Sequence, residues 1–199
     1  MNKNVTGFTI ENSNQVKFLP VNISEIFPNL LVFKVINCSV KSVKSEHFAK
    51  MQALKILNLN GNEIETVASD SFKDLGNLTT LVLSRNQIKS VNPKWFKSTS
   101  VLEVVYLDFN KIASIEENSF SHLKHLTRLH LEHNQIKLFS SKAFDHMVRL
   151  NRNSLYVELD GNICLNKTYR EIVNLNRDLE SNCTGLLTND STQSSLQCL

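Results

Sequence analysis

The chain has 199 residues, of which 41% are hydrophobic, and its 22 basic and 19 acidic residues leave a formal net charge of +3. This length and composition predict a folded chain, either one domain with a sizeable core or an array of small repeated units. The scattered charges exclude the basic footprint of a nucleic-acid-binding or membrane-surface protein. No apolar run approaches the roughly 20 residues that a membrane-spanning helix needs.

The chain begins with MNKNVTGF, which lacks the apolar segment of a secretory signal peptide. It is therefore either cytosolic or a secreted chain whose leader has been removed. Two features favour a secreted glycoprotein. Three of the four cysteines lie within residues 164–199, which is typical of a disulfide-closed terminus in an oxidising compartment. Seven N-glycosylation sequons occur where chance would give roughly four: Asn4, Asn22, Asn37, Asn77, Asn166, Asn182 and Asn189.

Residues 1–29 form a degenerate first unit or cap, with a predicted strand around Phe8 and Ile10. The unit fits the pattern of the following repeats through Val5, Val16 and Leu19, with one residue inserted.

Residues 30–163 repeat one pattern every 24 residues. The last unit, SLYVELDGNIC, fits after about four extra residues. The first column is leucine: Leu30, Leu54, Leu78, Leu102, Leu126 and Leu150. A later column holds Cys38, Asn62, Asn86, Asn110 and Asn134, and the last holds Phe48, Phe72, Phe96, Phe120 and Phe144. Several columns that recur together define an internal repeat.

This pattern resembles the leucine-rich repeat, L-x-x-L-x-L-x-x-N/C-x-L, in its 24-residue extracellular form. The resemblance covers about residues 5–163. It implies an α/β solenoid, a horseshoe with a parallel β-sheet on the concave face and irregular or 3-10 segments on the convex side. It is specific for architecture and not for one activity.

The repeated columns have a structural explanation. Alternate leucines of L-x-L point into the core, and the amide of Asn62 and its equivalents satisfies backbone groups of the turn. Phe72 and its equivalents enter the core from the convex side, and Cys38 is expected to be a small, buried, reduced thiol. Function is therefore expected at the positions between the columns.

Side chains between the strand leucines point onto the concave face. In its first half they are small, amide-rich or aliphatic. In its second half they include the aromatic and arginine side chains that are enriched at binding hot spots. The predicted ligand-binding residues are Tyr106, Asp108, Phe109, Arg128, His130, Glu132, His133, Tyr156 and Glu158. The alternative is a solvated face on which Arg128 pairs with Asp108 or Glu158.

Five of the six histidines lie between His122 and His146. His130, Glu132 and His133 could approach one another near Asp108. Alternate strand positions, however, project about 7 Å apart, and no HExxH or CxxC pattern is present, so no metal site is expected. The chain also has no G-x-S-x-G, P-loop or G-x-G-x-x-G motif, so we expect no cofactor, no catalytic residues and no enzyme activity.

Residues 164–199 are the predicted C-terminal cap and tail. The segment TYREIVNLNRDL has the apolar spacing of a short helix over 168–179. Resemblance to the cysteine-bearing caps of secreted leucine-rich repeat proteins implies a Cys164–Cys183 disulfide, although the usual N-P-W-x-C-x-C is absent. Cys198 has three possible mates: Cys183, another chain, or a segment outside this sequence.

These observations predict a secreted, non-enzymatic recognition module that binds a protein ligand or receptor on the second half of its concave face. Resemblance to insect innate-immunity proteins and receptor ectodomains implies a role in immunity or signalling. The alternative is a structural or assembly protein that uses its convex side or Cys198 for contacts and leaves the concave face unused.

Overall fold

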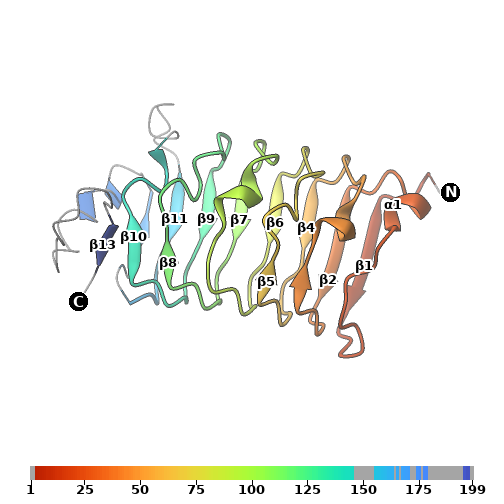
Figure 1. The fold of residues 1–199 in the computed structure, drawn as a ribbon, viewed down its shortest axis with the longest axis horizontal. Helices are drawn as coiled ribbons and strands as arrows, with labels where there is room; N and C mark the ends of the chain where they lie inside the picture. Colours follow the sequence, from red (N-terminus) through yellow and green to blue (C-terminus); the bar gives the residue numbers. More distant parts are fainter. Residues whose placement is uncertain are drawn as a thin grey trace.

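The computed structural model describes residues 3–145, 155–163, 165, 167–170, 174–175, 177–178 and 195–197. Within them the repeats form successive coils of an elongated solenoid, with the two ends of the chain at its opposite ends (Figure 1). One face carries a sheet of eight strands in the order β1-β2-β4-β6-β7-β9-β11-β12. These are β1 (Gly7–Glu11), β2 (Val32–Ile36), β4 (Ile56–Asn58), β6 (Thr80–Val82), β7 (Val104–Tyr106), β9 (Arg128–His130), β11 (Tyr156–Glu158) and β12 (Thr168–Tyr169).

Within this sheet, β1, β2, β4, β6, β7, β9 and β11 run parallel to one another, and their register follows the repeat. Val104 pairs with Arg128, 24 positions later. Gly7 pairs with Val32 and Arg128 pairs with Tyr156, which are steps of 25 and 28 residues. The predicted sheet and both insertions are therefore confirmed.

The opposite side is built from short and irregular segments, as predicted. They include α1 (Ile23–Ile26), the 3-10 helices η1 (Ser45–Phe48) and η2 (Pro93–Phe96), and a parallel pair formed by β3 (Ser42–Val43) and β5 (Thr66–Val67). A second small sheet joins β8 (Ser114–Ile115) and β13 (Ser195–Gln197) to the two sides of β10 (Leu138–Ser140).

The phenylalanine column forms a continuous aromatic core behind the sheet. Its five members have no exposed surface, and the ring of Phe120 lies 5.8 Å from Phe96 and 5.4 Å from Phe144. Between Phe72 and Phe96 the sequence pattern missed Trp95, whose ring lies 6.4 and 6.2 Å from these two. The predicted phenylalanine core is thus confirmed, with one added ring.

The asparagine column forms a ladder of hydrogen bonds along the solenoid. Asn110 donates from Nδ2 to the carbonyls of Leu83 and Leu107, and its Oδ1 accepts the backbone N–H of Ile88. The Leu107 carbonyl also accepts from Asn134, so each coil is tied to the next. Cys38 occupies the same column as a buried free thiol, as expected.

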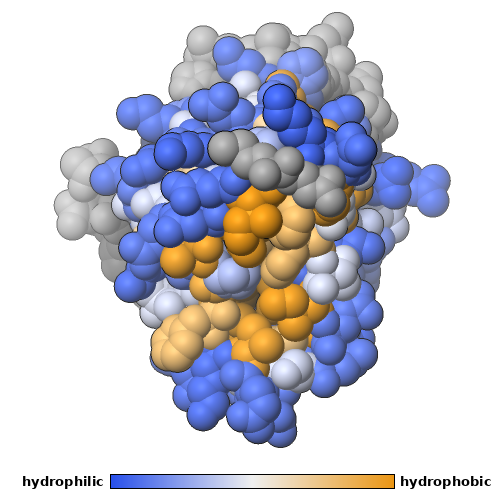
Figure 2. Space-filling view, turned by 90° about the vertical axis from the view of Figure 1, so that its right-hand side faces the viewer, coloured by the Kyte–Doolittle hydropathy of each residue, from blue (hydrophilic) through white to orange (hydrophobic). Residues whose placement is uncertain are grey.

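The N-terminal end is closed by β1, where the Phe8 ring stacks 5.1 Å from that of Phe33. This end still presents apolar side chains to solvent: Phe18 is 79% exposed, Val21 49% and Ile26 53%. Figure 2 shows the resulting apolar patch, surrounded by polar residues.

At the C-terminal end, the helix predicted over 168–179 is wrong at its start. Thr168 and Tyr169 form β12, which runs antiparallel to β11 and satisfies backbone groups on its outer edge. Tyr169 is buried, and its hydroxyl donates to Asp178. The predicted disulfide between Cys164 and Cys183, together with Cys198 and Leu150, lies outside the described residues.

Candidate functional site

The repeat aligns side chains of neighbouring coils into rows across the concave face. Tyr106 of β7 pairs with His130 of β9, which pairs in turn with Glu158 of β11. Arg128 and Tyr156 form part of the adjacent row. Eight of the nine predicted site residues, all but Arg128, also take part in the ring or polar contacts described below.

His130, Glu132 and Glu158 converge on one point, and we call them the acid–histidine cluster. His130 Nδ1 lies 3.4 Å from Glu132 Oε1 and 3.3 Å from Glu158 Oε2. The three side chains are only 14%, 18% and 24% exposed. Burial lowers the pKa of His130, but the neighbouring carboxylates of Glu132 and Glu158 outweigh it, so the pKa is raised overall.

Tyrosine rings enclose the imidazole of the cluster. The Tyr106 ring of β7 stacks on the His130 ring, with centroids 4.4 Å apart and planes 15° apart. The centroid of the Tyr156 ring, on the neighbouring strand β11, lies 6.4 Å from that of His130. The hydrogen bond between Tyr156 and Glu158 raises the pKa of the Tyr156 hydroxyl. These contacts hold the aromatic rings in defined positions on the face.

A second set of contacts follows the turn after each strand, and we call Arg85, Phe109 and His133 the turn stack. The Arg85 guanidinium lies 4.3 Å from the centre of the Phe109 ring, and the His133 ring stacks 4.3 Å from Phe109 on the next coil. All three residues have left-handed backbone, with φ of 55°, 51° and 52°. Arg85 was not among the predicted site residues, although it occupies the same repeat position as Phe109.

Two polar arrangements that the sequence left open do not form. Asp108 accepts a 2.6 Å hydrogen bond from Ser84 Oγ, and Arg128, which is exposed, makes no ion pair with Asp108 or Glu158 within the described part of the chain. The cluster recruits Glu158 instead of His133 and Asp108. The expected separation of about 7 Å between the side chains of His130 and Glu132 is not observed. It applies to residues within a strand, and β9 ends at His130, so Glu132 lies in the turn that follows.

The comparisons with known proteins agree with this architecture. A leucine rich repeat profile matches residues 28–88, 53–112, 76–136 and 100–156, more than half of the chain. The chain therefore belongs to the leucine-rich repeat family. No curated protein matches it. Among the described residues, no helix is both long and apolar enough to cross a bilayer.

One similar solved structure is that of a TLR13–ssRNA13 complex, with a TM-score of 0.59 and 19% sequence identity. The likeness covers 79% of this chain but 25% of the TLR13 chain, so this chain spans about a quarter of that protein's length. Since 309 chains of solved structures match, the fold by itself does not single out one activity.

Proposed function

We propose that this protein is a secreted, non-enzymatic recognition module that binds a protein partner on the second half of its concave face. The observation that carries the proposal is the concentration there of ordered aromatic, arginine and histidine side chains. Such residues dominate the binding energy of protein interfaces. The leucine-rich repeat fold supports the same general role, since its curved sheet offers an extended binding surface.

The side chains of this surface are already positioned before any partner binds. Phe109 is held between Arg85 and His133, yet 38% of it remains exposed. Tyr106 is fixed against His130. A surface that is ordered in advance loses less conformational entropy on association, and this favours tight binding.

The charge of the surface indicates the chemistry of the partner. Four carboxylates, those of Asp108, Glu132, Glu158 and Asp160, share it with the guanidinium groups of Arg85 and Arg128. In the metal-free chain these groups leave the surface acidic, although the whole chain is basic. This balance favours a partner with basic side chains and disfavours the phosphates of a nucleic acid.

An extracellular location and a role in innate immunity or receptor signalling form part of the proposal. Four sequon asparagines within the described residues, Asn4, Asn22, Asn37 and Asn77, are exposed, so an oligosaccharide transferase could reach them. The other three, Asn166, Asn182 and Asn189, lie outside the described residues. The similarity to a TLR13 chain supports the receptor-like role at the level of fold.

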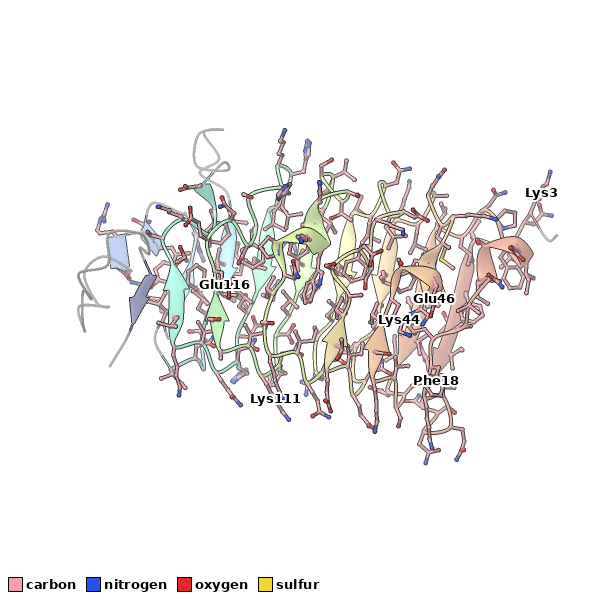
Figure 3. All side chains as sticks on the ribbon, viewed as in Figure 1. Lys3, Phe18, Lys44, Glu46, Lys111 and Glu116 are labelled. Carbon is pink, nitrogen blue, oxygen red and sulfur yellow. The ribbon has the colours of Figure 1, made fainter. Side chains whose placement is uncertain are left out.

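The proposal is tested by capture from native extracellular fluid with three baits. These are the wild type, a concave triple variant (Tyr106→Ala, Arg128→Ala, His130→Ala) and a matched control. The control carries Phe18→Ala, Lys111→Ala and His125→Ala, which remove the same kinds of side chain from exposed positions elsewhere; Phe18 and Lys111 are labelled in Figure 3. We expect a protein that the wild type and the control retain and the concave variant loses. Equal capture by all three folded baits would favour the assembly role through the convex side or Cys198.

A further inference from the structure

We propose that the acid–histidine cluster is a binding site for one Zn²⁺ ion, with His130, Glu132 and Glu158 as its protein ligands. One ligand atom from each residue lies within 4.8 Å of the others. The residues come from two adjacent coils, since Glu158 faces His130 across the parallel pair β9–β11. This inference goes beyond the proposed recognition function and does not depend on it.

The contact between His130 Nδ1 and Glu158 Oε2 is within hydrogen-bond range but long, and a bridging cation would account for both separations from Nδ1. A charge-assisted bond from an imidazolium to a carboxylate is about 2.7–2.9 Å long, whereas the two separations from His130 Nδ1 are 3.4 and 3.3 Å. A single N–H shared between both carboxylates would also make two weaker contacts than one directed bond. Ligands placed about 2.0–2.2 Å from a tetrahedral Zn²⁺ stand roughly 3.4 Å apart, which matches both separations.

A buried oxygen atom of Glu132 gives an independent indication. Among the described residues, three buried side-chain nitrogen or oxygen atoms have no hydrogen-bond partner, and two of them are Glu132 Oε2 and His130 Nε2. A buried carboxylate oxygen without a partner is costly, and a cation bound at the Glu132 carboxylate would offset that cost.

The donor set distinguishes Zn²⁺ from Ca²⁺ and Mg²⁺. One imidazole nitrogen and two carboxylates suit Zn²⁺, whereas Ca²⁺ and Mg²⁺ prefer sites made entirely of oxygen. Two carboxylates also supply the negative charge that compensates a divalent ion. Three protein ligands leave one tetrahedral position, which water or a side chain of a bound partner would fill on the concave face.

Calorimetric titration of the untagged, chelator-treated chain with zinc chloride tests the proposal. We expect one Zn²⁺ per chain with a dissociation constant in the micromolar range or tighter, and no comparable heat with calcium or magnesium chloride. Glu132→Gln and Glu158→Gln keep the side-chain shape and should each weaken binding about tenfold or more. His125→Asn, an exposed histidine outside both the cluster and the proposed binding surface, is the matched control and should leave the affinity unchanged.

Optical spectroscopy with Co²⁺ gives a second readout, since a tetrahedral site produces visible absorption bands that disappear in His130→Asn. Urea unfolding establishes that each variant retains its fold. Absence of zinc binding in the wild type would overturn the proposal. So would undiminished affinity in both folded glutamine variants, because the ion would then occupy another site.

The titration contains no partner protein, so its result is separate from the test of the recognition function. A chain that binds Zn²⁺ but captures no partner would retain the metal site and lose the proposed function. A chain that captures a partner equally well in the presence of a chelator, and binds no Zn²⁺, would retain the proposed function and lose the metal site.

Discussion

The imidazole of His133 lies directly over Gly161, so that a Cβ at Gly161 would stand 2.5 Å from His133 Nδ1. Gly161 also has a left-handed backbone, with φ of +72°. The turn stack therefore ends against a residue without a side chain, and the position of His133 depends on that absence.

Gly161→Ala should lower the free energy of unfolding by about 1–2 kcal/mol for the left-handed conformation, plus a further loss from the clash with His133. In a His133→Ala background only the first loss should remain, because the clash is gone. Urea unfolding of the two single variants and the double variant measures both parts. Gly7→Ala, where no other atom lies within 4 Å, is the control, and an equal loss there would contradict this reading.

Asn110→Ala should cost about 2 kcal/mol or more, because the buried N–H of Ile88 loses its acceptor and three carbonyls each lose a donor. The exposed Asn14 offers a matched control, since Asn14→Ala disturbs no backbone hydrogen bond and should change stability by less than about 0.5 kcal/mol. Denaturant midpoints compare the two. Similar small effects would show that the asparagine ladder contributes little.

Phe120→Ala should destabilise the solenoid by about 3–5 kcal/mol, since it removes a fully buried ring packed between Phe96 and Phe144. Phe18→Ala removes the same ring from a position that is 79% exposed and should have little effect. Thermal unfolding of both variants gives the comparison. A loss at Phe120 no larger than that at Phe18 would argue against a continuous aromatic core.

His47 should make stability depend on pH. Its Nδ1 accepts the backbone N–H of Lys44 at 3.0 Å, which requires a neutral ring. Burial lowers the pKa of His47, the nearby Glu46 opposes that effect, and Lys44 adds to it; both neighbours are labelled in Figure 3. The unfolded chain therefore binds the proton first as pH falls below 6.5.

The stability that His47 contributes is consequently present above pH 6.5 and is lost as pH falls through the lowered folded pKa. Unfolding free energies at about pH 7.5 and pH 5, compared between wild type and His47→Gln, isolate this contribution from other groups. The wild type should lose more stability over that interval than the variant. Parallel pH profiles would contradict the assignment.

The fold followed from the sequence because a 24-residue step fixes the register and the inward faces of the coils from β2 to β9, and the two insertions account for the coils at either end. The rows formed by Tyr106, His130 and Glu158 could be anticipated for the same reason. Contacts made beyond the ends of the strands could not be predicted in this way. The direction of Glu132 and the stacking of Arg85 on Phe109 depend on turn geometry, which the column pattern does not specify.

The prediction of a helix that begins at Thr168 was wrong for a related reason. Tyr169 fits the apolar spacing of a helix, but the open edge of β11 offered backbone hydrogen bonds that local pattern does not reveal. Trp95 likewise enters the core beside a phenylalanine column that was already complete by sequence. In both cases a tertiary contact prevailed over local periodicity.

Oxidative footprinting of the complex with the captured partner tests the recognition surface most directly, because it reads side-chain exposure at single residues by mass spectrometry. The account predicts that the bound partner protects Tyr106, Phe109 and Tyr156 from hydroxyl radicals and leaves Phe18 as reactive as in the free chain. Protection confined to Phe18 or to the convex side, with the three concave rings unchanged, would contradict it.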